Sequence, residues 1–548
     1  MIIEGEGFSE YVDYFQKVRE SIIKIDDIED LAIRNQKIEQ IIADSIEFAQ
    51  NIIHTNEYFE AGELLFSVAE LLEEIAYTRT FDLYENVISY WEEQIHSFQM
   101  QGKIHEISEL FLRIAEIYGE KLNKFDLERK NILKSIRFLK QESELLLQFN
   151  EGRKIAQNFQ NIAELYLKLN NFERAIEYYT KVIKFAKTLN YFDILSYSFK
   201  QISLCYEELD DFKNAKNIIL DAIDYFTELY EKFRKKNDNL ALAQISQILK
   251  NLYQFLEDNE QYIFYSKREA GSYINVAEQL AKDEKNFYKI ARYYRGAALC
   301  YKDIQENHLE AASCFVLAGN YCEKIEDFNQ TAINYFDAAK IFKQIKNYEM
   351  AYRHFMKAGN NFWKIEEHNK STESFLNAYD VAVEGNLEFN RYGLFNQIIR
   401  GLNTIAKDGL QNKQFYTAAT LILESIKFYE QLDTAKDFLL KEMIKNTYKY
   451  YYRAANLKKV GHSHIVHSYV IASLSLILIG KLDKAKEIIY EIEPESKTIN
   501  DFKTMIDIII KKLSEGKEVS IDTLPFKIQR LIKGSDDIKY LLTLFGRL

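Results

Sequence analysis

Residues 310–321 read Glu-Ala-Ala-Ser-Cys-Phe-Val-Leu-Ala-Gly-Asn-Tyr, and residues 332–342 read Ala-Ile-Asn-Tyr-Phe-Asp-Ala-Ala-Lys-Ile-Phe. Both stretches carry a small residue, an aromatic ring four positions later and an alanine three positions after that. Four copies occur between residues 311 and 378, with first residues 21, 19 and 20 positions apart. They are Ala311-Phe315-Ala318, Ala332-Phe336-Ala339, Ala351-Phe355-Ala358 and the degenerate Ser371-Phe375-Ala378.

This spacing predicts helices that interlock. Positions i, i+4 and i+7 share one face of a helix, so each copy presents a ring between two small residues. A neighbouring helix with the same pattern can then approach closely. A period near 20 residues leaves about 15 for a helix and a few for a turn. Two such helices form an antiparallel hairpin of about 40 residues, and stacked hairpins form a solenoid with a long binding face.

A longer form of the repeat lies upstream and matches the tetratricopeptide pattern. Its two copies are 40 residues apart, longer than the usual repeat of about 34. Polar turns are predicted at 169–171 and 209–211, and weaker hairpins at 60–75 and around Ala115 and Tyr118. An ordinary helical bundle is the alternative reading. The two copies are Ile162-Ala163-x2-Tyr166 with Phe172, Ala175, Tyr179 and Val182, and Ile202-Ser203-x2-Tyr206 with Phe212, Ala215, Ile219 and Ala222.

Composition supports an all-α protein. Hydrophobic residues make up 47% of the 548 residues, enough for a large core, and there are only 2 prolines and 19 glycines. A chain so poor in both residues is typical of helices. The net charge of -12 is spread along the chain, which argues against nucleic acid as a partner because phosphate binding needs concentrated Lys and Arg.

The apolar and thiol-bearing residues indicate a cytoplasmic protein. The acidic start at residues 4–6 does not resemble a secretory signal. The longest apolar run, residues 465–479, is short for a bilayer span and is predicted to be a buried helix. Four cysteines lack metal-type spacing and are predicted to be buried thiols in a reducing compartment: Cys205, Cys300, Cys314 and Cys322.

Three regions are predicted. Residues 1–270 hold tetratricopeptide-like repeats, with a solvated turn at 231–239, and residues 271–490 hold the second set of repeats. Pro494, Gly516 and Pro525 then interrupt the pattern. The remaining residues, 491–548, are predicted to form a helical bundle that caps the solenoid, with helices at 499–513, 524–533 and 537–545.

Residues 285–548 resemble the soluble NSF attachment proteins, the SNAP family. The resemblance rests on 310–321 and 332–342, on Tyr450-Tyr-Tyr-Arg-Ala-Ala455, and on the closing segments 484–494 and 501–513. These adaptors carry bundled SNARE helices to a hexameric AAA+ ATPase. The resemblance implies a tetratricopeptide-like α-solenoid of antiparallel helix hairpins with a C-terminal bundle cap.

The resemblance also implies site residues. Arg353, Arg400 and Arg453 are basic where the family grips the SNARE bundle, and a guanidinium pairs carboxylates in a forked geometry. The alternative interpretation is that these three arginines occupy ordinary solvent-exposed positions on their helices. Leu548 corresponds to the family's ATPase-stimulating leucine, although the acidic tail is missing. Ile2-Ile3 and Phe8 are a faint counterpart of the membrane-dipping loop, so peripheral membrane contact is left open.

One cluster suggests metal chemistry. His464 and His467 are three positions apart on a helix and could share a zinc ion, with His462 beside them. No nearby cysteine or carboxylate completes the set, which favours a solvated helix start. Phosphate-binding glycine loops and nucleophile motifs are missing, so neither an enzyme nor a cofactor is predicted.

The sequence therefore predicts a non-catalytic SNAP-like adaptor in membrane trafficking. Its expected partners are helical or coiled-coil SNARE-like proteins and an AAA+ ATPase of the N-ethylmaleimide-sensitive factor type. The alternative is a general tetratricopeptide scaffold or signalling regulator that binds a peptide or protein without an ATPase.

Overall fold

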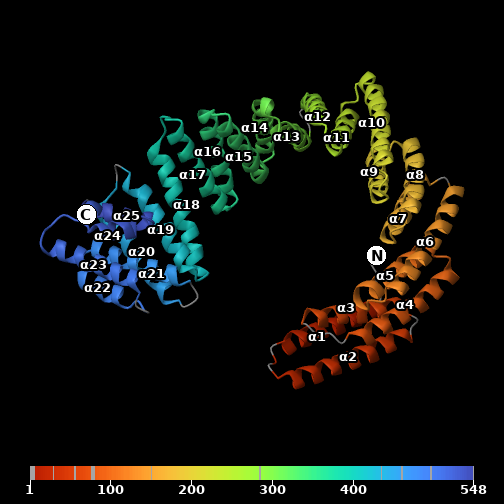
Figure 1. The fold of residues 1–548 in the computed structure, drawn as a ribbon, viewed down its shortest axis with the longest axis horizontal. Coiled ribbons are helices and arrows are strands. Elements are labelled where there is room, and N and C mark those ends of the chain that lie inside the picture. Colours follow the sequence, from red (N-terminus) through yellow and green to blue (C-terminus); the bar gives the residue numbers. More distant parts are fainter. Residues whose placement is uncertain are drawn as a thin grey trace. The chain divides into compact units, whose positions relative to one another are not determined.

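The computed structural model describes residues 6–26, 28, 30–54, 57–75, 80–149, 151–282, 286–432, 435–457, 461–493 and 496–546. Within these ranges all regular structure is helical and no strand occurs, so the all-α prediction is confirmed. Consecutive helices within each part of the chain pack side by side, as Figure 1 shows for α13 to α17. This is the predicted solenoid of helix hairpins.

The chain divides into two compact units. Unit 1 comprises Met1–Lys235 and Gln247–Tyr262, and unit 2 comprises Lys236–Ser246 and Ile263–Leu548. The predicted domain boundaries at residues 270 and 490 stay predictions. The helices wholly within unit 1 are α1 Glu6–Asp26, α2 Leu31–Ile53, α3 Tyr58–Glu74, α4 Phe81–Gln101, α5 Ile104–Glu116, α6 Phe125–Gln148, α7 Gly152–Lys168, α8 Phe172–Leu189, α9 Phe192–Glu208 and α10 Phe212–Lys235, with a π-helical turn at Ile117–Lys121.

Helices α11 (Asn239–Phe255) and α12 (Asn259–Ala281) each carry residues of both units. The turn predicted at 231–239 is shorter than expected: α10 continues to Lys235 and α11 begins at Asn239, so residues 236–238 separate the two helices. The other helices of unit 2 are α13 Phe287–Lys302, α14 His308–Lys324, α15 Phe328–Gln344, α16 Tyr348–Lys364, α17 His368–Glu384, α18 Arg391–Gln411, α19 Phe415–Glu430, α20 Asp437–Asn456, α21 His462–Leu478, α22 Leu482–Tyr490, α23 Lys497–Ser514, α24 Phe526–Ile532 and α25 Asp536–Thr543.

Helices α14 to α17 begin 20 residues apart, at 308, 328, 348 and 368. The ring at the eighth position of each is buried, and it is Phe315, Tyr335, Phe355 or Phe375. The prediction for the second copy is therefore wrong by one residue: its buried ring is Tyr335 and not Phe336. Tyr335 is fully buried there, whereas Phe336 is half-buried and packs edge-on against Phe355. In the sequence, Phe336 fits the pattern as well as Tyr335 does. Ala332 and Ala339 flank Phe336 at the same spacing at which Thr331 and Ala338 flank Tyr335.

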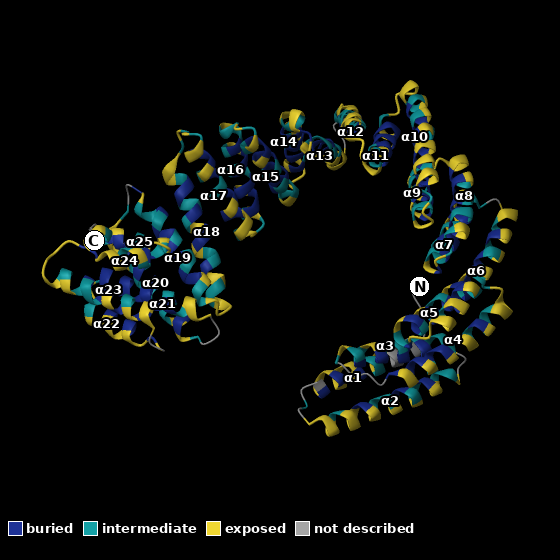
Figure 2. Ribbon diagram, viewed as in Figure 1, coloured by how far each residue is buried: buried dark blue, intermediate teal, exposed yellow. Residues whose placement is uncertain are grey.

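Small residues in one helix receive the ring of the next. A Cβ atom at Gly359 would lie 2.7 Å from the Phe375 ring, and one at Gly319 would lie 2.8 Å from the Tyr335 ring. The rings therefore fill clefts beside small residues, as predicted, but the residues that leave the room are the glycines directly after Ala318 and Ala358. Figure 2 shows the resulting line of buried residues between successive helices.

Helices α7 to α10 also begin 20 residues apart, at 152, 172, 192 and 212. The predicted turns at 169–171 and 209–211 separate them. Asn170, Asn190 and Asp210 take positive φ angles of 53°, 54° and 58° at the helix ends. The matching turns of unit 2 are formed by Glu326, Lys346, Glu366 and Asn386.

A helical bundle follows the repeats in unit 2. Helix α21 contains the apolar run at 465–479 and is buried on nearly all sides. Helices α22 to α25 pack around it in one core that also includes residues of α19 and α20. The three predicted terminal helices are present, and each end lies one or two residues from its predicted position. No helix among the described residues has the length and apolar character needed to cross a bilayer.

Candidate protein-binding pocket

The three predicted arginines lie on alternate helices of unit 2 and are all exposed. Arg353 of α16 contacts the Glu349 carboxylate at 3.5 Å. The guanidinium of Arg400 (α18) lies 4.2 Å from the Trp363 ring centre, and that of Arg453 (α20) lies 5.7 Å from Phe415. Each arginine therefore has a different contact, and none shares its contact with another.

The contact of Arg453 belongs to a repeated arrangement. A cation in the last turn of a helix lies over the aromatic residue that begins the preceding helix, because neighbouring helices run antiparallel. Such contacts also complement the negative end of the helix dipole. The three pairs are Lys324 over Phe287 at 5.0 Å, Lys364 over Phe328 at 4.3 Å and Arg453 over Phe415 at 5.7 Å.

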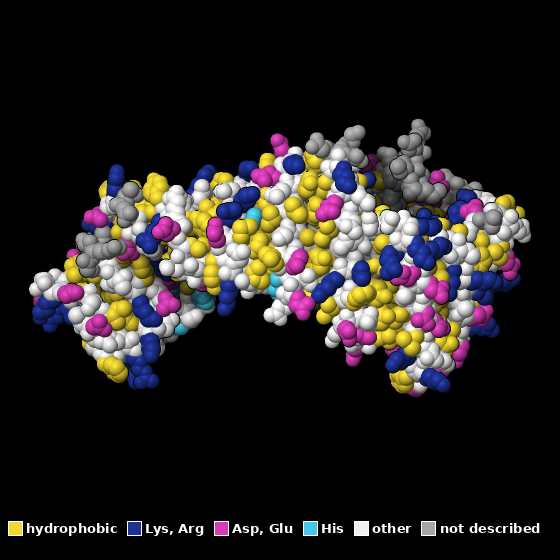
Figure 3. Space-filling view, turned by 90° about the horizontal axis from the view of Figure 1, so that it is seen from above, with side chains coloured by type: hydrophobic (Ala, Val, Ile, Leu, Met, Phe, Trp, Pro, Cys, Tyr) yellow, Lys and Arg dark blue, Asp and Glu magenta, His cyan; other side chains and the backbone are white. Residues whose placement is uncertain are grey.

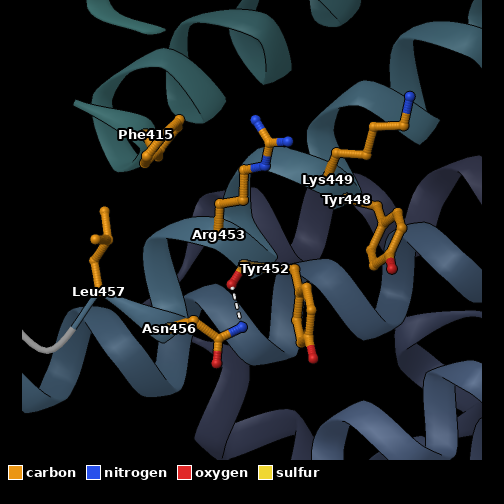
Figure 4. Close-up of a pocket in the computed structure, with 7 residues that line it drawn as sticks. All are labelled: Phe415, Tyr448, Lys449, Tyr452, Arg453, Asn456 and Leu457. Atoms are coloured by element: carbon orange, nitrogen blue, oxygen red, sulfur yellow. Dashed lines mark hydrogen bonds between the residues drawn. The ribbon is translucent and has the colours of Figure 1, made fainter. Parts of the chain in front are cut away.

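Arg453 differs from the other two cations because it borders a pocket of about 490 Å³ (Figure 4). The pocket lies between the start of α19 and the last turns of α20. Its walls combine three aromatic rings and an aliphatic side chain with two cations. The lining residues are Phe415, Tyr448, Lys449, Tyr452, Arg453, Asn456 and Leu457.

The pocket walls are held in place by hydrogen bonds. The Asn456 Nδ2 donates to the Tyr452 carbonyl at 3.0 Å, and the Tyr469 hydroxyl donates to Asn456 Oδ1 at 3.3 Å. The Tyr452 hydroxyl donates to the Glu491 carboxylate at 3.1 Å. Desolvation and this carboxylate raise the pKa of Tyr452, so its hydroxyl stays protonated. The Tyr448 and Tyr452 rings stack with centres 6.0 Å apart.

The cations of this pocket have no counter-ion in the part of the chain that the structure describes. Among the described residues, neither Lys449 nor Arg453 has a carboxylate within ion-pair distance. An acidic side chain from another molecule would therefore find two positive charges beside an apolar surface. On the face seen in Figure 3, basic and acidic side chains are otherwise intermixed.

Sequence reasoning found Arg453 but missed Lys449, Phe415 and Tyr448. Lys449 and Arg453 are four positions apart on one helix face, and that spacing could have revealed the pair. Phe415 comes from another helix, so no local pattern points to it. Leu548 and Ile2-Ile3 lie outside the described residues, as does the side chain of Phe8.

The histidine cluster begins α21. His462 and His464 are exposed, in keeping with the solvated helix start. His467 instead joins helices: its Nδ1 lies 3.3 Å from the Tyr416 hydroxyl, and its Nε2 lies 3.4 Å from Ser535. Burial lowers the pKa of His467. In the described part of the chain, no three His, Cys, Asp or Glu residues gather closely enough to hold a metal ion.

The four cysteines are thiols that form no disulfide with one another. Cys205, Cys314 and Cys322 are buried, as predicted, and Cys300 is half-buried. Desolvation raises the pKa of each of the three buried thiols to about 11. They therefore remain protonated near neutral pH and behave as small core residues.

Comparison with known proteins supports the repeat. The tetratricopeptide repeat family matches at residues 156–188, which cover most of α7 and nearly all of α8. The chain therefore contains a tetratricopeptide-like repeat where the sequence pattern placed one. No curated protein sequence matches the chain.

Similar solved structures were also found. One is a signal transduction ATPase with numerous domains that bears a tetratricopeptide repeat sensor, from Pyrococcus horikoshii. It is 14% identical in sequence, the match covers 81% of this chain and 56% of that chain, and the TM-score is 0.27. Another is the TPR2AB domain of yeast Sti1 in complex with a pHSP90, at 14% identity, 63% and 99% coverage and a TM-score of 0.18. The third is BtubC from P. vanneervenii, at 13% identity, 56% and 92% coverage and a TM-score of 0.15.

Proposed function

We propose that this chain is a non-catalytic helical-repeat scaffold that binds a protein partner. The tetratricopeptide-like repeat and the stacked helices support this class of function, since each hairpin leaves side chains exposed along a continuous array. The observation that carries the proposal is the α19–α20 pocket, where two unpaired cations adjoin aromatic rings.

The pocket suits a partner segment with an acidic residue beside a bulky apolar residue. Lys449 and Arg453 would pair the carboxylate, and Phe415 with the two tyrosines would cover the apolar side chain. Burying aromatic surface and pairing a partly desolvated charge are the features that concentrate binding energy in protein interfaces.

Charge reversal at the pocket tests this proposal. The full chain carrying Lys449→Glu and Arg453→Glu should capture its partner from cell extract at least roughly tenfold less than the wild type, because attraction becomes repulsion. The difference should shrink as salt rises. The matched control is Lys407→Glu with Lys441→Glu, two exposed lysines on α18 and α20 outside the pocket. Equal loss in both variants, or none in either, would contradict the proposal.

The second candidate is the SNAP-like adaptor. It would bind SNARE-type helical bundles through Arg353, Arg400 and Arg453 and recruit an AAA+ ATPase of the N-ethylmaleimide-sensitive factor type at its C-terminal bundle, with Leu548 in contact. Two observations favour it: the three arginines are exposed on alternate helices, and Phe526 of the terminal bundle is 80% exposed.

Two substitutions separate this candidate from the general scaffold. Arg353→Glu with Arg400→Glu should weaken binding to a purified four-helix SNARE bundle and reduce its salt dependence. Arg391→Glu, on an exposed arginine at the start of α18, is the control. Phe526→Asp should abolish retention of the ATPase hexamer while leaving bundle binding intact. Unchanged affinities would rule out the adaptor.

A further inference from the structure

A second pocket lies in unit 2, between α13 and α15. It has a volume of about 310 Å³, and Cys322 at the end of α14 forms part of its wall. Helix α13 contributes Arg292 and Arg295, and α15 contributes Gln330 and the buried Asn334. Polar side chains therefore face one another across the space between two alternate helices.

Arg295 is fixed in this pocket. Its Nη1 donates to Asn334 Oδ1 at 2.6 Å and to Asp337 Oδ2 at 3.2 Å. The guanidinium also lies 5.5 Å from the centre of the Phe315 ring. Asn334 is only 1% exposed, so it holds the arginine from within the core. The remaining donors, on Nε and Nη2, have no protein partner in the described ranges.

Comparison along the repeat shows that packing does not require this arginine. Arg295 is the ninth residue of α13. The ninth residues of the next four helices are apolar: Val316, Phe336, Met356 and Leu376. An arginine has thus replaced an apolar side chain at one helix of the array, and a buried amide and a carboxylate orient it. Such support is typical of residues that bind a ligand.

Arg292 supplies a second charge. Its guanidinium lies 6.0 Å from the Tyr288 ring, and among described residues it has no ion-pair or hydrogen-bond partner. The nearby carboxylates are already engaged. Asp327 Oδ1 caps α15 by accepting from the backbone N–H of Gln330 at 3.0 Å, which leaves the Gln330 side chain out of this bond, and Asp337 pairs with Arg295. Arg292 is therefore the cation of this pocket that has no ion-pair partner among the described residues.

We infer that this pocket binds the carboxylate of a glutamate or aspartate side chain in a partner protein, an inference that rests on the proposed scaffold function. The donors of Arg292 and Arg295 would take the two oxygens, and the free Gln330 amide could add a third hydrogen bond. A single negative charge fits better than the double charge of a phosphate, because Asp327 and Asp337 lie close by.

Peptide pools test the inference directly. The full chain is passed over immobilised pools of random 12-residue peptides whose sixth residue is fixed as Glu, Gln, Lys or phosphoserine. The wild type should be retained roughly tenfold more by the Glu pool than by the Gln pool, as expected for a charge-assisted pair. Arg292→Gln should lower this ratio clearly because one of the two charges is lost, and Arg295→Lys should lower it because lysine lacks the fork.

The control variant is Lys289→Gln, which removes the same charge from an exposed residue of α13 outside the pocket. Its Glu-to-Gln ratio should equal that of the wild type. Equal retention of the Glu and Gln pools by the wild type, an unchanged ratio in Arg292→Gln, or stronger retention by phosphoserine would overturn the inference. The proposed function is judged separately, by partner capture with the α19–α20 variants.

Discussion

Helices α7 to α10 and helices α14 to α17 repeat at the same interval of 20 residues but fill equivalent positions differently. In the first region, α7 to α10, the fourth residue of each helix alternates between a large and a small side chain. These residues are Ile155, Ala175, Leu195 and Ala215. In the second it is always small, as Ala311, Thr331, Ala351 and Ser371. One region therefore repeats every two helices, and the other repeats every helix.

The difference explains where the tetratricopeptide pattern can be recognised. That pattern describes a pair of unlike helices, and the match at residues 156–188 falls where unlike helices alternate. In α14 to α17 the eleventh position is alanine every time, at Ala318, Ala338, Ala358 and Ala378. Each helix there carries an aromatic ring at the eighth position and alanine at the eleventh, and in α14 and α16 a glycine follows that alanine and receives the ring of the next helix.

The largest expected effect is at the ring itself. Phe375→Ala should lower the free energy of unfolding by about 3–5 kcal/mol, because the ring is fully buried against Gly359. Hydrogen exchange should speed up in α16 to α18. In the first region, the ring at the eighth position of α7, Phe159, is only half-buried, so Phe159→Ala should cost clearly less. Equal losses at both sites would show that the two regions pack alike.

A buried histidine in the second region should make its stability depend on pH. His354 is 3% exposed, stacks between the Tyr335 and Phe342 rings, and has no hydrogen-bond partner on either ring nitrogen among the described residues. Burial, with smaller contributions from Lys357 and Arg353, lowers its pKa from 6.5 to about 4. The folded state therefore holds the ring neutral where the unfolded chain binds a proton.

The free energy of unfolding should fall by about 3 kcal/mol as pH drops from 6.5 to about 4, and this contribution is fully present above pH 6.5. His354→Phe keeps a ring between its neighbours and should remove this part of the pH dependence in denaturant titrations. His462→Phe, at an exposed position, is the control. A steep fall that persists in His354→Phe would assign the effect to other groups.

Filling the cleft at Gly359 should lower the free energy of unfolding nearly as much as removing the ring. Gly359→Ala places a methyl group 2.7 Å from the Phe375 ring, so the helices must separate, at a cost of about 1–3 kcal/mol. Gly271→Ala is the control, because nothing lies within 4 Å of its added methyl group. That change should stabilise α12 by about 0.5–1 kcal/mol. A neutral result at Gly359 in thermal unfolding would mean that the interface adapts easily.

The sequence predicted what depends on local periodicity. The turns at 169–171 and 209–211 followed from the spacing of the repeat, and the terminal helices followed from the proline and glycine breaks. Three of the four cysteines are buried as predicted. The register of the second copy was predicted wrongly because two adjacent aromatic residues, Tyr335 and Phe336, both have small residues at the spacing that the pattern requires. Only the three-dimensional packing against Gly319 decides between them.

The candidate sites were predictable only in part. Arg453 lies on a helix face that the sequence defines, but its pocket needs Phe415, which is 38 positions away in the chain and meets it only because α19 and α20 run antiparallel. The same holds for Arg295, whose orientation depends on Asn334 and Asp337 of α15. Interactions between separate helices carry no short-range sequence signal.

The smallest expected effect concerns the turns. The first region places Asn170, Asn190 and Asp210 at the positive-φ position, whereas the second region places Glu326, Lys346 and Glu366 there. Asparagine and aspartate tolerate this left-handed conformation better than glutamate and lysine, which lose about 1 kcal/mol or more to contact between Cβ and the backbone.

Lys346→Gly should therefore stabilise the second region by about 1 kcal/mol, because glycine adopts a φ of 59° without strain. Asn190→Lys should destabilise the first region by a similar amount. Chemical denaturation of the two variants should move the transition midpoint in opposite directions. If both substitutions move it the same way, the side chains at these turns matter through contacts and not through backbone conformation, and the contrast between the two regions would then lie in helix packing alone.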